Sequence, residues 1–505
     1  MLLSKYNLKN ITTSAVSIPD TAMFELPEKV LQFGTGVLLR GLPDYFIDKA
    51  NKQGIFNGRI VVVKSTDSAG STAFDKQDGL YTLCVRGIEA GASKNEDIIS
   101  ASISRVLSAR NEWNKILECA HNPQMQIIIS NTTEIGIALV HDDIMRYPPV
   151  SFPGKLLAFL VERYKAFAGS KQCGMVIIPT ELITDNGKKL ESIVTELAYL
   201  NGLDETFIDW LENCNHFCNS LVDRIVPGKP GVDAKSAIEK KLGYSDELLI
   251  TCEPYRLWAI EGDAAIKDIL SFADADDGVV VTTDINLFRE LKLRLLNGTH
   301  TLSCGVAILS GFTTVKEAMD DTGFDNYISS LMECEIAKAI PYAVEPSMAE
   351  AFAKKVIDRF HNPQIEHQWL SITVQYTTKM KMRVVPLLVQ HYKLYNNVPE
   401  NISLGFAAYI LFMHGVKKEE GNYFGLFNGD HYPINDDKAS FFYEMWQTLK
   451  PASMAAAVLS DIALWGQDLS VLPGFAAAVQ EKMTVISTQG ITAILHSSKQ
   501  KKVLA

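Results

Sequence analysis

The stretch Val30-Leu-Gln-Phe-Gly34-Thr-Gly36-Val-Leu-Leu-Arg40 decides the fold class of this chain. An apolar, strand-like run enters two glycines and continues as an apolar segment with helical spacing. Gly34 permits a sharp turn, and Gly36 lets backbone N–H groups approach a pyrophosphate at the start of a helix. Leu39 occupies the place of the usual third glycine, so an ordinary strand-to-helix turn is the alternative. The pattern predicts a Rossmann-type dinucleotide site.

The next β-branched run supports this interpretation. Residues 59–64 lead into Ser65-Thr-Asp67, where Rossmann domains often place an acid that binds the ribose hydroxyls. Asp67 is the candidate for that role, while Lys64 adds a cation that could tolerate a 2′-phosphate. The residues alone leave the choice between NAD and NADP open.

Similar runs alternate with helical segments through the first half of the chain. The strand-like runs cover residues 29–33, 59–64, 126–130, 175–179 and 278–283. Continuous apolar strands separated by helices predict a parallel sheet covered on both faces. After about residue 286, helical spacing dominates, beginning with residues 285–296. We expect an α/β protein with a doubly wound, Rossmann-type domain over residues 1–283 and a mainly α-helical domain over residues 284–505.

Polar turns follow two of the predicted strands. Ser130-Asn-Thr-Thr-Glu134 follows one, and Pro179-Thr-Glu181 follows another. The carboxyl ends of parallel strands are where ligands of such sheets bind. The two turns therefore either share a ligand site or are plain turns with helix N-caps.

The second half opens with Lys292-Leu-Arg-Leu-Leu-Asn297-Gly298-Thr-His300. A helix and the turn after it could aim Lys292, Asn297 and His300 together. A lysine beside a histidine and an amide donor suits acid/base chemistry at a carbonyl. The alternative is a solvated lysine on an amphipathic helix that ends at the Asn297-Gly298 pair, a good C-cap.

Composition limits the class of protein and its partners. The 505 residues are 47% hydrophobic and 21% charged, with 59 acidic against 48 basic side chains and a net charge of -11. These values predict a globular protein without a nucleic-acid partner, since no basic block exceeds a short C-terminal tail. No apolar run is long enough for a bilayer, and the start lacks a signal-peptide pattern. We expect a cytoplasmic monomer or small homo-oligomer with no membrane partner.

Taken together, these segments resemble the long-chain polyol-specific dehydrogenases, the mannitol dehydrogenase family, over nearly the whole chain. The motifs that carry the resemblance are Gly34-Thr-Gly36, Gln77-Asp-Gly-Leu-Tyr-Thr-Leu83, residues 130–136, Leu221-Val-Asp223-Arg-Ile, Glu253-Pro-Tyr-Arg-Leu-Trp258 and, most specifically, residues 292–300. The resemblance implies NAD as the cofactor and a cleft between the two domains without a catalytic metal. It also implies that Lys292 is the general acid in reduction and that Asn297 and His300 polarise the carbonyl.

The same resemblance extends to the binding residues. The expected cofactor-binding residues are Leu31, Gln32, Phe33, Gly34, Thr35, Gly36, Val37, Leu38, Leu39, Arg40, Asp67, Thr133 and Glu134. Asp223 corresponds to a family acid that contacts the substrate or orders the site, and Lys379 falls on a family substrate-binding lysine. Residues 130–134, 181–187 and 217–226 resemble a branch of the family whose substrate is a sugar acid, a ketouronate reduced to an aldonate.

Two departures from the polyol enzymes bear on the substrate. Glu181 lies near a family asparagine, and an ionised glutamate cannot donate a hydrogen bond. Glu181 is therefore a protonated acid, a proton relay to Lys292, or a substrate-binding residue whose oxyanion role falls to another group. A family arginine is replaced by Ser371, but Lys379 and Arg383, four residues apart, could share one helix face and bind a carboxylate.

Two alternative functions stay open. One is a fructuronate or mannitol oxidoreductase of the same fold, and the other is a non-catalytic, dinucleotide-binding regulatory protein. The joint presence of Lys292, Asn297 and His300 argues against the second, because a sensor needs no proton donor.

Overall fold

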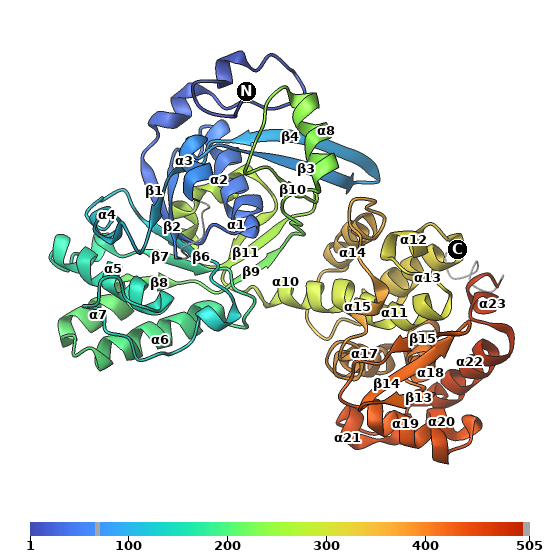
Figure 1. Ribbon diagram of the computed structural model, residues 1–505. Helices are drawn as coiled ribbons and strands as arrows, with labels where there is room; N and C mark the ends of the chain where they lie inside the picture. The colour runs from blue at the N-terminus through green and yellow to red at the C-terminus, as the bar shows by residue number, and fades with distance from the viewer. Residues whose placement is uncertain (66–70, 498–505) are drawn as a thin grey trace. The chain divides into compact units, whose positions relative to one another are not determined.

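The computed structural model describes residues 1–65 and 71–497. The chain forms two compact units. The N-terminal unit comprises Met1–Gly87 and Ser93–Ile285, and the C-terminal unit comprises Ile88–Ala92 and Asn286–Ala505. In Figure 1 the N-terminal unit runs from blue to green, and the C-terminal unit runs from yellow to red.

A six-stranded sheet forms the centre of the N-terminal unit (Figure 1). Its strands are β1 (Glu28–Phe33), β2 (Arg59–Lys64), β5 (Ile103–Ser108), β6 (Ile127–Ser130), β7 (Val176–Pro179) and β8 (His216–Phe217). All neighbours are parallel, in the order β5-β2-β1-β6-β7-β8. The strand order therefore reverses between β1 and β6, which is the ligand-binding switch point of a Rossmann sheet. The predicted fold class is confirmed.

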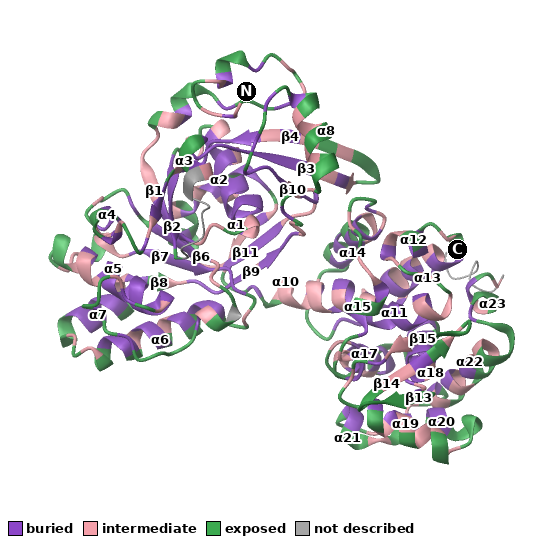
Figure 2. Ribbon diagram, viewed as in Figure 1, coloured by how far each residue is buried: buried purple, intermediate pink, exposed green. Residues whose placement is uncertain are grey.

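Alternating side chains of the sheet enter two separate cores. The strands are largely buried, as their purple colour in Figure 2 shows. Val30 and Val62 contribute to one core, and Leu31 and Val61 to the other. The first core includes side chains of α1 (Val37–Gly41), α2 (Pro43–Lys52) and α3 (Ser71–Lys76). The second includes those of α4 (Trp113–Cys119), α5 (Phe152–Ala166), α6 (Asn186–Leu200) and α7 (Glu205–Cys214). Burial on both faces explains why the strands are apolar without alternation.

Two smaller sheets complete the N-terminal unit. One has the order β10-β3-β4, from β3 (Tyr81–Glu89), β4 (Ala92–Ser100) and β10 (Ile250–Cys252). The other has the order β12-β11-β9, from β9 (Ser220–Asp223), β11 (Leu257–Glu261) and β12 (Val279–Thr282). The run over residues 278–283 was therefore wrongly assigned to the main sheet, because it pairs with β11 instead. Helices α8 (Val232–Leu242) and α9 (Ala264–Ile269) lie in the same unit.

The C-terminal unit is mainly helical. Its α-helices are α10 (Asn286–Leu291), α11 (Thr299–Leu309), α12 (Val315–Met319), α13 (Thr322–Ser330), α14 (Pro346–Phe360), α15 (Trp369–Ile372), α16 (Tyr376–Lys379), α17 (Val385–Tyr395), α18 (Glu400–Phe412), α19 (Ala439–Thr448), α20 (Met454–Ser460), α21 (Ile462–Trp465), α22 (Phe475–Gln489) and α23 (Thr492–Leu495). Helix α18 is buried along almost its whole length and packs against α11 and α22. Strands β13 (Lys417–Glu419), β14 (Asn422–Phe427) and β15 (Asp430–Pro433) form an antiparallel sheet. Within the described ranges, no helix is both long enough and apolar enough to cross a membrane.

Three segments of this unit are π-helical, with i→i+5 hydrogen bonds. They are η6 (Lys292–Gly298), η7 (Leu331–Ile336) and η8 (Met380–Val384). Segment η6 joins α10 to α11 without a break, so the helix does not end at Asn297-Gly298 as a C-cap pair would require. Gly298 keeps helical angles, φ -64 and ψ -45, because the following helix α11 is buried and its packing outweighs the weak helix propensity of Asn and Gly.

Candidate functional site

The turn after β1 needs glycine at one position and leaves open space at another. Gly34 has φ +129, and a Cβ there would lie 2.9 Å from Leu39 Cδ1 and 3.0 Å from the Asn131 carbonyl oxygen. A Cβ on Gly36, by contrast, would meet no atom within 4 Å. The backbone at Gly36 is therefore open to a ligand, and it lies at the switch point of the sheet. This geometry fits the close approach of a pyrophosphate.

The helix after the turn is short. Helix α1 ends at Gly41, and Leu42 leaves the helical region with φ -132 and ψ -78, since a residue that precedes proline, here Pro43, disfavours α geometry. The Arg40 side chain is buried, donates through Nη1 to the Leu248 carbonyl at 2.5 Å and lies over the Tyr81 ring. Arg40 can therefore contribute its backbone to a nucleotide site, but its guanidinium is engaged in the core.

The other predicted cofactor residues divide by burial. Leu31, Gln32, Phe33 and Leu39 are buried, whereas Thr35, Gly36, Val37 and Leu38 are partly or fully exposed. Asp67 lies outside the described residues, and Glu134 begins a short 3₁₀ turn, η3 (Glu134–Gly136). Thr133 has φ +110, which is a rare conformation for a β-branched residue and is typical of strained functional turns.

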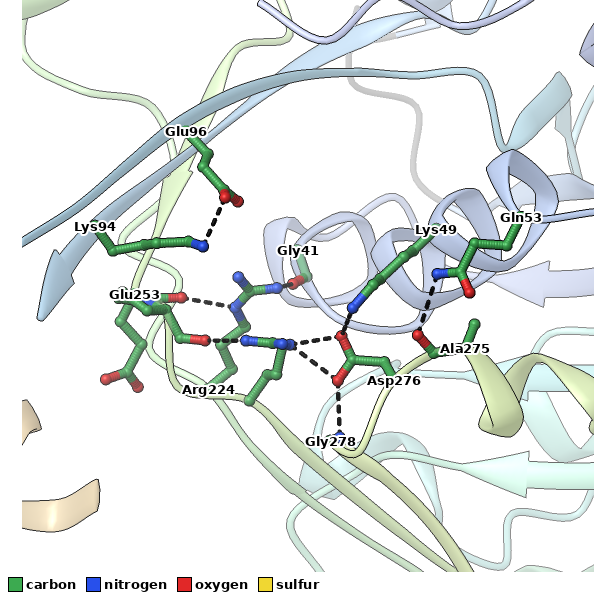
Figure 3. A network of polar contacts seen from close by, with 12 residues as sticks. Gly41, Lys49, Gln53, Lys94, Glu96, Arg224, Glu253, Ala275, Asp276 and Gly278 are labelled. Atoms are coloured by element: carbon green, nitrogen blue, oxygen red, sulfur yellow. Dashed lines mark hydrogen bonds and ion pairs between the residues drawn. The ribbon is translucent and has the colours of Figure 1, made fainter. Parts of the chain in front are cut away.

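Figure 3 shows the polar network that holds the break between α1 and α2. Arg224 donates through Nη1 to the Gly41 carbonyl at 2.6 Å and through Nε to the Glu253 carbonyl at 3.0 Å. The Glu253 carboxylate accepts from the Ile225 amide at 2.6 Å. The motifs around residues 221–226 and 253–258 therefore support the segment that follows the glycine turn. Asp223 is buried at the end of β9, opposite Leu257.

A second part of the network joins α2 to the start of β12. Asp276 accepts from Lys49 at 2.6 Å, from Arg256 at 2.8 Å and from the Gly278 amide at 2.7 Å (Figure 3). Burial raises the pKa of Asp276, but Arg256, Lys49 and Gly278 outweigh it and bring the pKa below its usual value. The carboxylate is thus ionised and stabilising at neutral pH.

Glu181 organises the turn after β6. Its carboxylate accepts from the Thr132 amide at 2.8 Å, the Thr132 hydroxyl at 3.0 Å and the Ser130 hydroxyl at 3.1 Å. The Asn131 amide donates to the Phe33 carbonyl at 3.1 Å, which ties this turn to the end of β1. Burial raises the pKa of Glu181, and the bonds from Thr132 and Ser130 oppose that rise. Its predicted contact with the substrate stays a prediction.

In the C-terminal unit, the π-helical winding of η6 changes the angle between the directions in which Lys292 and Asn297 leave the helix. At 100° per residue, positions five apart on an α-helix point about 140° apart. A wider i→i+5 turn brings them closer to one side. π-Helical insertions are frequent at functional sites. The structure thus presents Lys292 and Asn297 from η6 and His300 from the first turn of α11.

The His300 ring is packed and kept neutral. It stacks on Phe360 at a centroid distance of 4.4 Å and contacts His367 edge-on at 5.1 Å. Burial, then His367 and the cations Arg359, Arg383 and Lys379, hold the pKa of His300 well below its usual range. Its Nε2 atom is buried and has no hydrogen-bond partner among residues 1–65 and 71–497. A neutral imidazole with an unused nitrogen can bind a polar ligand.

Lys379 and Arg383 lie at the end of α16 and in η8. Lys379 donates to the Ile372 carbonyl at 2.9 Å, and Arg383 donates to the Thr301 hydroxyl at 3.1 Å. Burial and Arg383 lower the pKa of Lys379, and burial lowers the pKa of Arg383. In the described part of the chain, neither has a carboxylate within ion-pair distance. Asp436 acts on Lys379 only from beyond that distance, so the two partly buried cations suit an anionic ligand.

Three neighbours of these groups were missed in the sequence: Thr301, Phe360 and Arg294. Thr301 accepts from Arg383 and donates to the Asn297 carbonyl at 2.7 Å. Thr301 directly follows His300 in the sequence, and this position could have marked it as a neighbour of the site. Nothing in the local pattern marks Phe360, which lies sixty positions from the histidine that it stacks on.

Comparisons with known proteins agree with this architecture. The domain profile described as the mannitol dehydrogenase Rossmann domain matches residues 28–271, and that of the mannitol dehydrogenase C-terminal domain matches residues 284–487. Among solved structures, mannitol 2-dehydrogenase of Pseudomonas fluorescens, in a ternary complex with NAD and D-mannitol, has a TM-score of 0.63 at 23% identity, covering 100% of this chain and 99% of that one. A substrate-free D-sorbitol dehydrogenase has a TM-score of 0.76 at 20% identity, with 98% and 100% coverage.

Curated relatives are more similar in sequence. Altronate oxidoreductase of Bacillus subtilis is 38% identical over 89% of this chain and 90% of its own length. The enzymes of the same name from Halalkalibacterium halodurans and Escherichia coli are 36% and 34% identical, over 92% of this chain and 92% and 96% of their lengths. The resemblance inferred from the motifs is confirmed. The chain belongs to the mannitol dehydrogenase family of oxidoreductases.

Proposed function

We propose that the protein is an NAD-dependent oxidoreductase that interconverts D-tagaturonate and D-altronate, a step of hexuronate catabolism. The observation that carries the proposal is the pair Lys379 and Arg383, whose side chains are partly buried without a carboxylate partner in the described ranges. A neutral polyol would leave the charge of these two cations uncompensated, whereas the carboxylate of a uronate neutralises it. The names of the curated relatives support the same substrate.

The cofactor is supported by the N-terminal unit. The Gly36 backbone is open at the switch point of a Rossmann-ordered sheet, and the solved P. fluorescens relative holds NAD. Lys64, the cation that would favour a 2′-phosphate, is buried at the end of β2. We therefore favour NAD over NADP and assign the pyrophosphate to the turn 34–36.

A bound dihydronicotinamide would supply the hydride that reduces the ketone. The carbonyl oxygen then carries negative charge, and Lys292 donates the proton that makes it a hydroxyl. The Asn297 amide and the neutral imidazole of His300 hold this oxygen by hydrogen bonds, since preorganised donors act where charge develops. In oxidation Lys292 takes the proton back. Lys379 and Arg383 bind the carboxylate and so fix the position of the ketone.

The test is NADH oxidation with tagaturonate, fructuronate and fructose supplied in parallel, repeated with NADPH. We expect the highest kcat/KM with tagaturonate and NADH. Preference for fructuronate would move the protein to another sugar-acid activity, and preference for fructose would contradict the carboxylate site. Nucleotide binding without turnover of any of the three would contradict an enzymatic role for Lys292.

A further inference from the structure

A proline leaves one backbone carbonyl of η8 in need of a donor. In an α-helix the amide of residue 386 would donate to the carbonyl of Met382, but residue 386 is proline and has no N–H. Its ring also disfavours close α-helical packing against that carbonyl, which agrees with the wider winding at Met380–Val384. The Met382 carbonyl must therefore find another donor.

Arg294 supplies that donor from the neighbouring π-helix. Its Nη1 donates to the Met382 carbonyl at 2.7 Å and to the Arg383 carbonyl at 2.9 Å. Its Nε donates to Glu290 at 2.9 Å, four residues back on the same helix. The side chain is only 8% exposed, so the guanidinium is fixed on both edges.

The position of Arg294 joins the two groups of functional residues in this unit. Arg294 lies in η6, between Lys292 and Asn297, and its carbonyl partners include that of Arg383 itself. We propose that Arg294 is a positioning residue that fixes η8, and with it the carboxylate-binding Arg383, relative to the Lys292 segment. This inference rests on the proposed function for the roles of Lys292 and Arg383.

The chemistry requires arginine. A planar guanidinium presents separate donors to Glu290 and to the carbonyls, whereas a lysine ammonium is a single centre that cannot span both sets of partners in the same way. The requirement also depends on Pro386. With alanine at position 386, the backbone gains an N–H that can serve the Met382 carbonyl, and Arg294 becomes less necessary.

This dependence gives a double-mutant test in the full-length protein. Wild type, Arg294→Met, Pro386→Ala and the double variant are compared for kcat and KM with tagaturonate, NADH affinity and thermal unfolding. We expect Arg294→Met to raise KM for tagaturonate and to lower kcat/KM about 10- to 100-fold, with NADH affinity unchanged. In the Pro386→Ala background the same substitution should cost at most a few-fold.

Two further variants serve as a conservative replacement and as a surface control. Arg294→Lys retains the charge and one donor nitrogen, and it should recover part of the loss even if Arg294→Met folds poorly. Lys381→Met, which removes an exposed cation from the same π-helix, should change KM less than twofold. Equal losses from Arg294→Met in both backgrounds would overturn the inference, as would full activity of Arg294→Met.

Parallel assays with fructose separate this inference from the proposed function. Should all variants reduce fructose better than tagaturonate while the coupling between positions 294 and 386 persists, Arg294 is a positioning residue and the uronate assignment is wrong. If tagaturonate is the preferred substrate and the substitutions at positions 294 and 386 are not coupled, the proposed function is supported and the positioning role of Arg294 is wrong.

Discussion

The guanidinium of Arg383 donates to the hydroxyl of Thr301 at 3.1 Å, and Thr301 is the residue next to His300. Thr301 in turn donates to the Asn297 carbonyl. The cation assigned to the substrate carboxylate is therefore bonded directly to the helix that presents the carbonyl-binding side chains. Binding of the carboxylate and orientation of the ketone should be coupled through this contact.

The first prediction concerns Arg383. Replacing it with methionine removes a charged partner of the carboxylate and should lower kcat/KM for tagaturonate by about 10- to 100-fold, because a buried, charge-assisted bond is worth a few kcal/mol. Fructose carries no carboxylate, so its kcat/KM should fall much less. Steady-state kinetics with both substrates measures the difference, and Lys381→Met serves as the exposed control. Equal losses on the two substrates would make Arg383 a structural residue.

The second prediction concerns the nucleotide turn. Gly36→Val should leave the fold intact, since a Cβ there meets no protein atom within 4 Å, yet it should weaken NADH binding at least about tenfold by blocking the pyrophosphate. Gly231→Val is the matched control. Gly231 also precedes a helix with nearly the same backbone angles, and a Cβ there likewise meets nothing within 4 Å. Unchanged NADH affinity of Gly36→Val in a fluorescence titration would place the nucleotide elsewhere.

The third prediction separates the roles left open for Glu181. Glu181→Gln keeps an oxygen for the two bonds from Thr132 and turns a nitrogen donor toward the Ser130 hydroxyl, but it removes the negative charge that strengthens these bonds and should loosen the turn at Thr132. We expect NADH affinity to fall several-fold with a smaller change in kcat. A large loss of kcat with normal NADH affinity and an altered pH profile would instead support a proton relay.

The fourth prediction concerns Asp44, which is fully buried beside Gln32. Burial raises its pKa to about 8, so the folded protein holds a proton that the unfolded chain releases above about pH 4. The free energy of unfolding should therefore fall by up to about 1.4 kcal/mol per pH unit between these values. Asp44→Asn removes this loss and should be more stable than wild type at pH 8.

Thermal unfolding across that pH range checks the Asp44 prediction. Asp276→Asn is the control of opposite sign, because the pKa of Asp276 is lowered and its ionised form stabilises the fold at neutral pH. Asp276→Asn should lower the melting temperature at pH 7. A pH dependence that is identical in wild type and Asp44→Asn would show that Asp44 is ionised in the folded protein.

The sequence was sufficient for the four central strands β2, β1, β6 and β7 and for the switch point, because β-branched runs and the Gly34–Gly36 turn are local signals of buried parallel strands. It did not reveal the edge strands β5 and β8. It was insufficient where tertiary burial overrides local preference. Asn297-Gly298 has the composition of a helix end, yet the packing of α11 carries the helix through it. Likewise, the helix break after Gly41 has two causes. Pro43 is a local signal in the sequence, but the bond from Arg224 to the Gly41 carbonyl joins residues that are far apart along the chain.

The candidate site divides in the same way. Lys292, Asn297 and His300 were predicted from spacing and family motifs, as were Lys379 and Arg383, and their roles stay predictions. Their environment was not, because the stacking of Phe360 on His300 and the bonds of Arg294 to η8 join segments separated by sixty to ninety residues. The π-helical winding of η6 has no local sequence rule from which it could have been predicted, whereas Pro386 was a local signal for the winding of η8.

The central claim is that Lys292 donates the proton in reduction. The most direct measurement is single-turnover oxidation of NADH by tagaturonate across pH, for wild type and Lys292→Ala. We predict that Lys292→Ala binds NADH normally but slows the chemical step by about 100-fold or more and changes the pH profile. Near-normal rates with an unchanged profile in Lys292→Ala would contradict the account and assign proton transfer to another group.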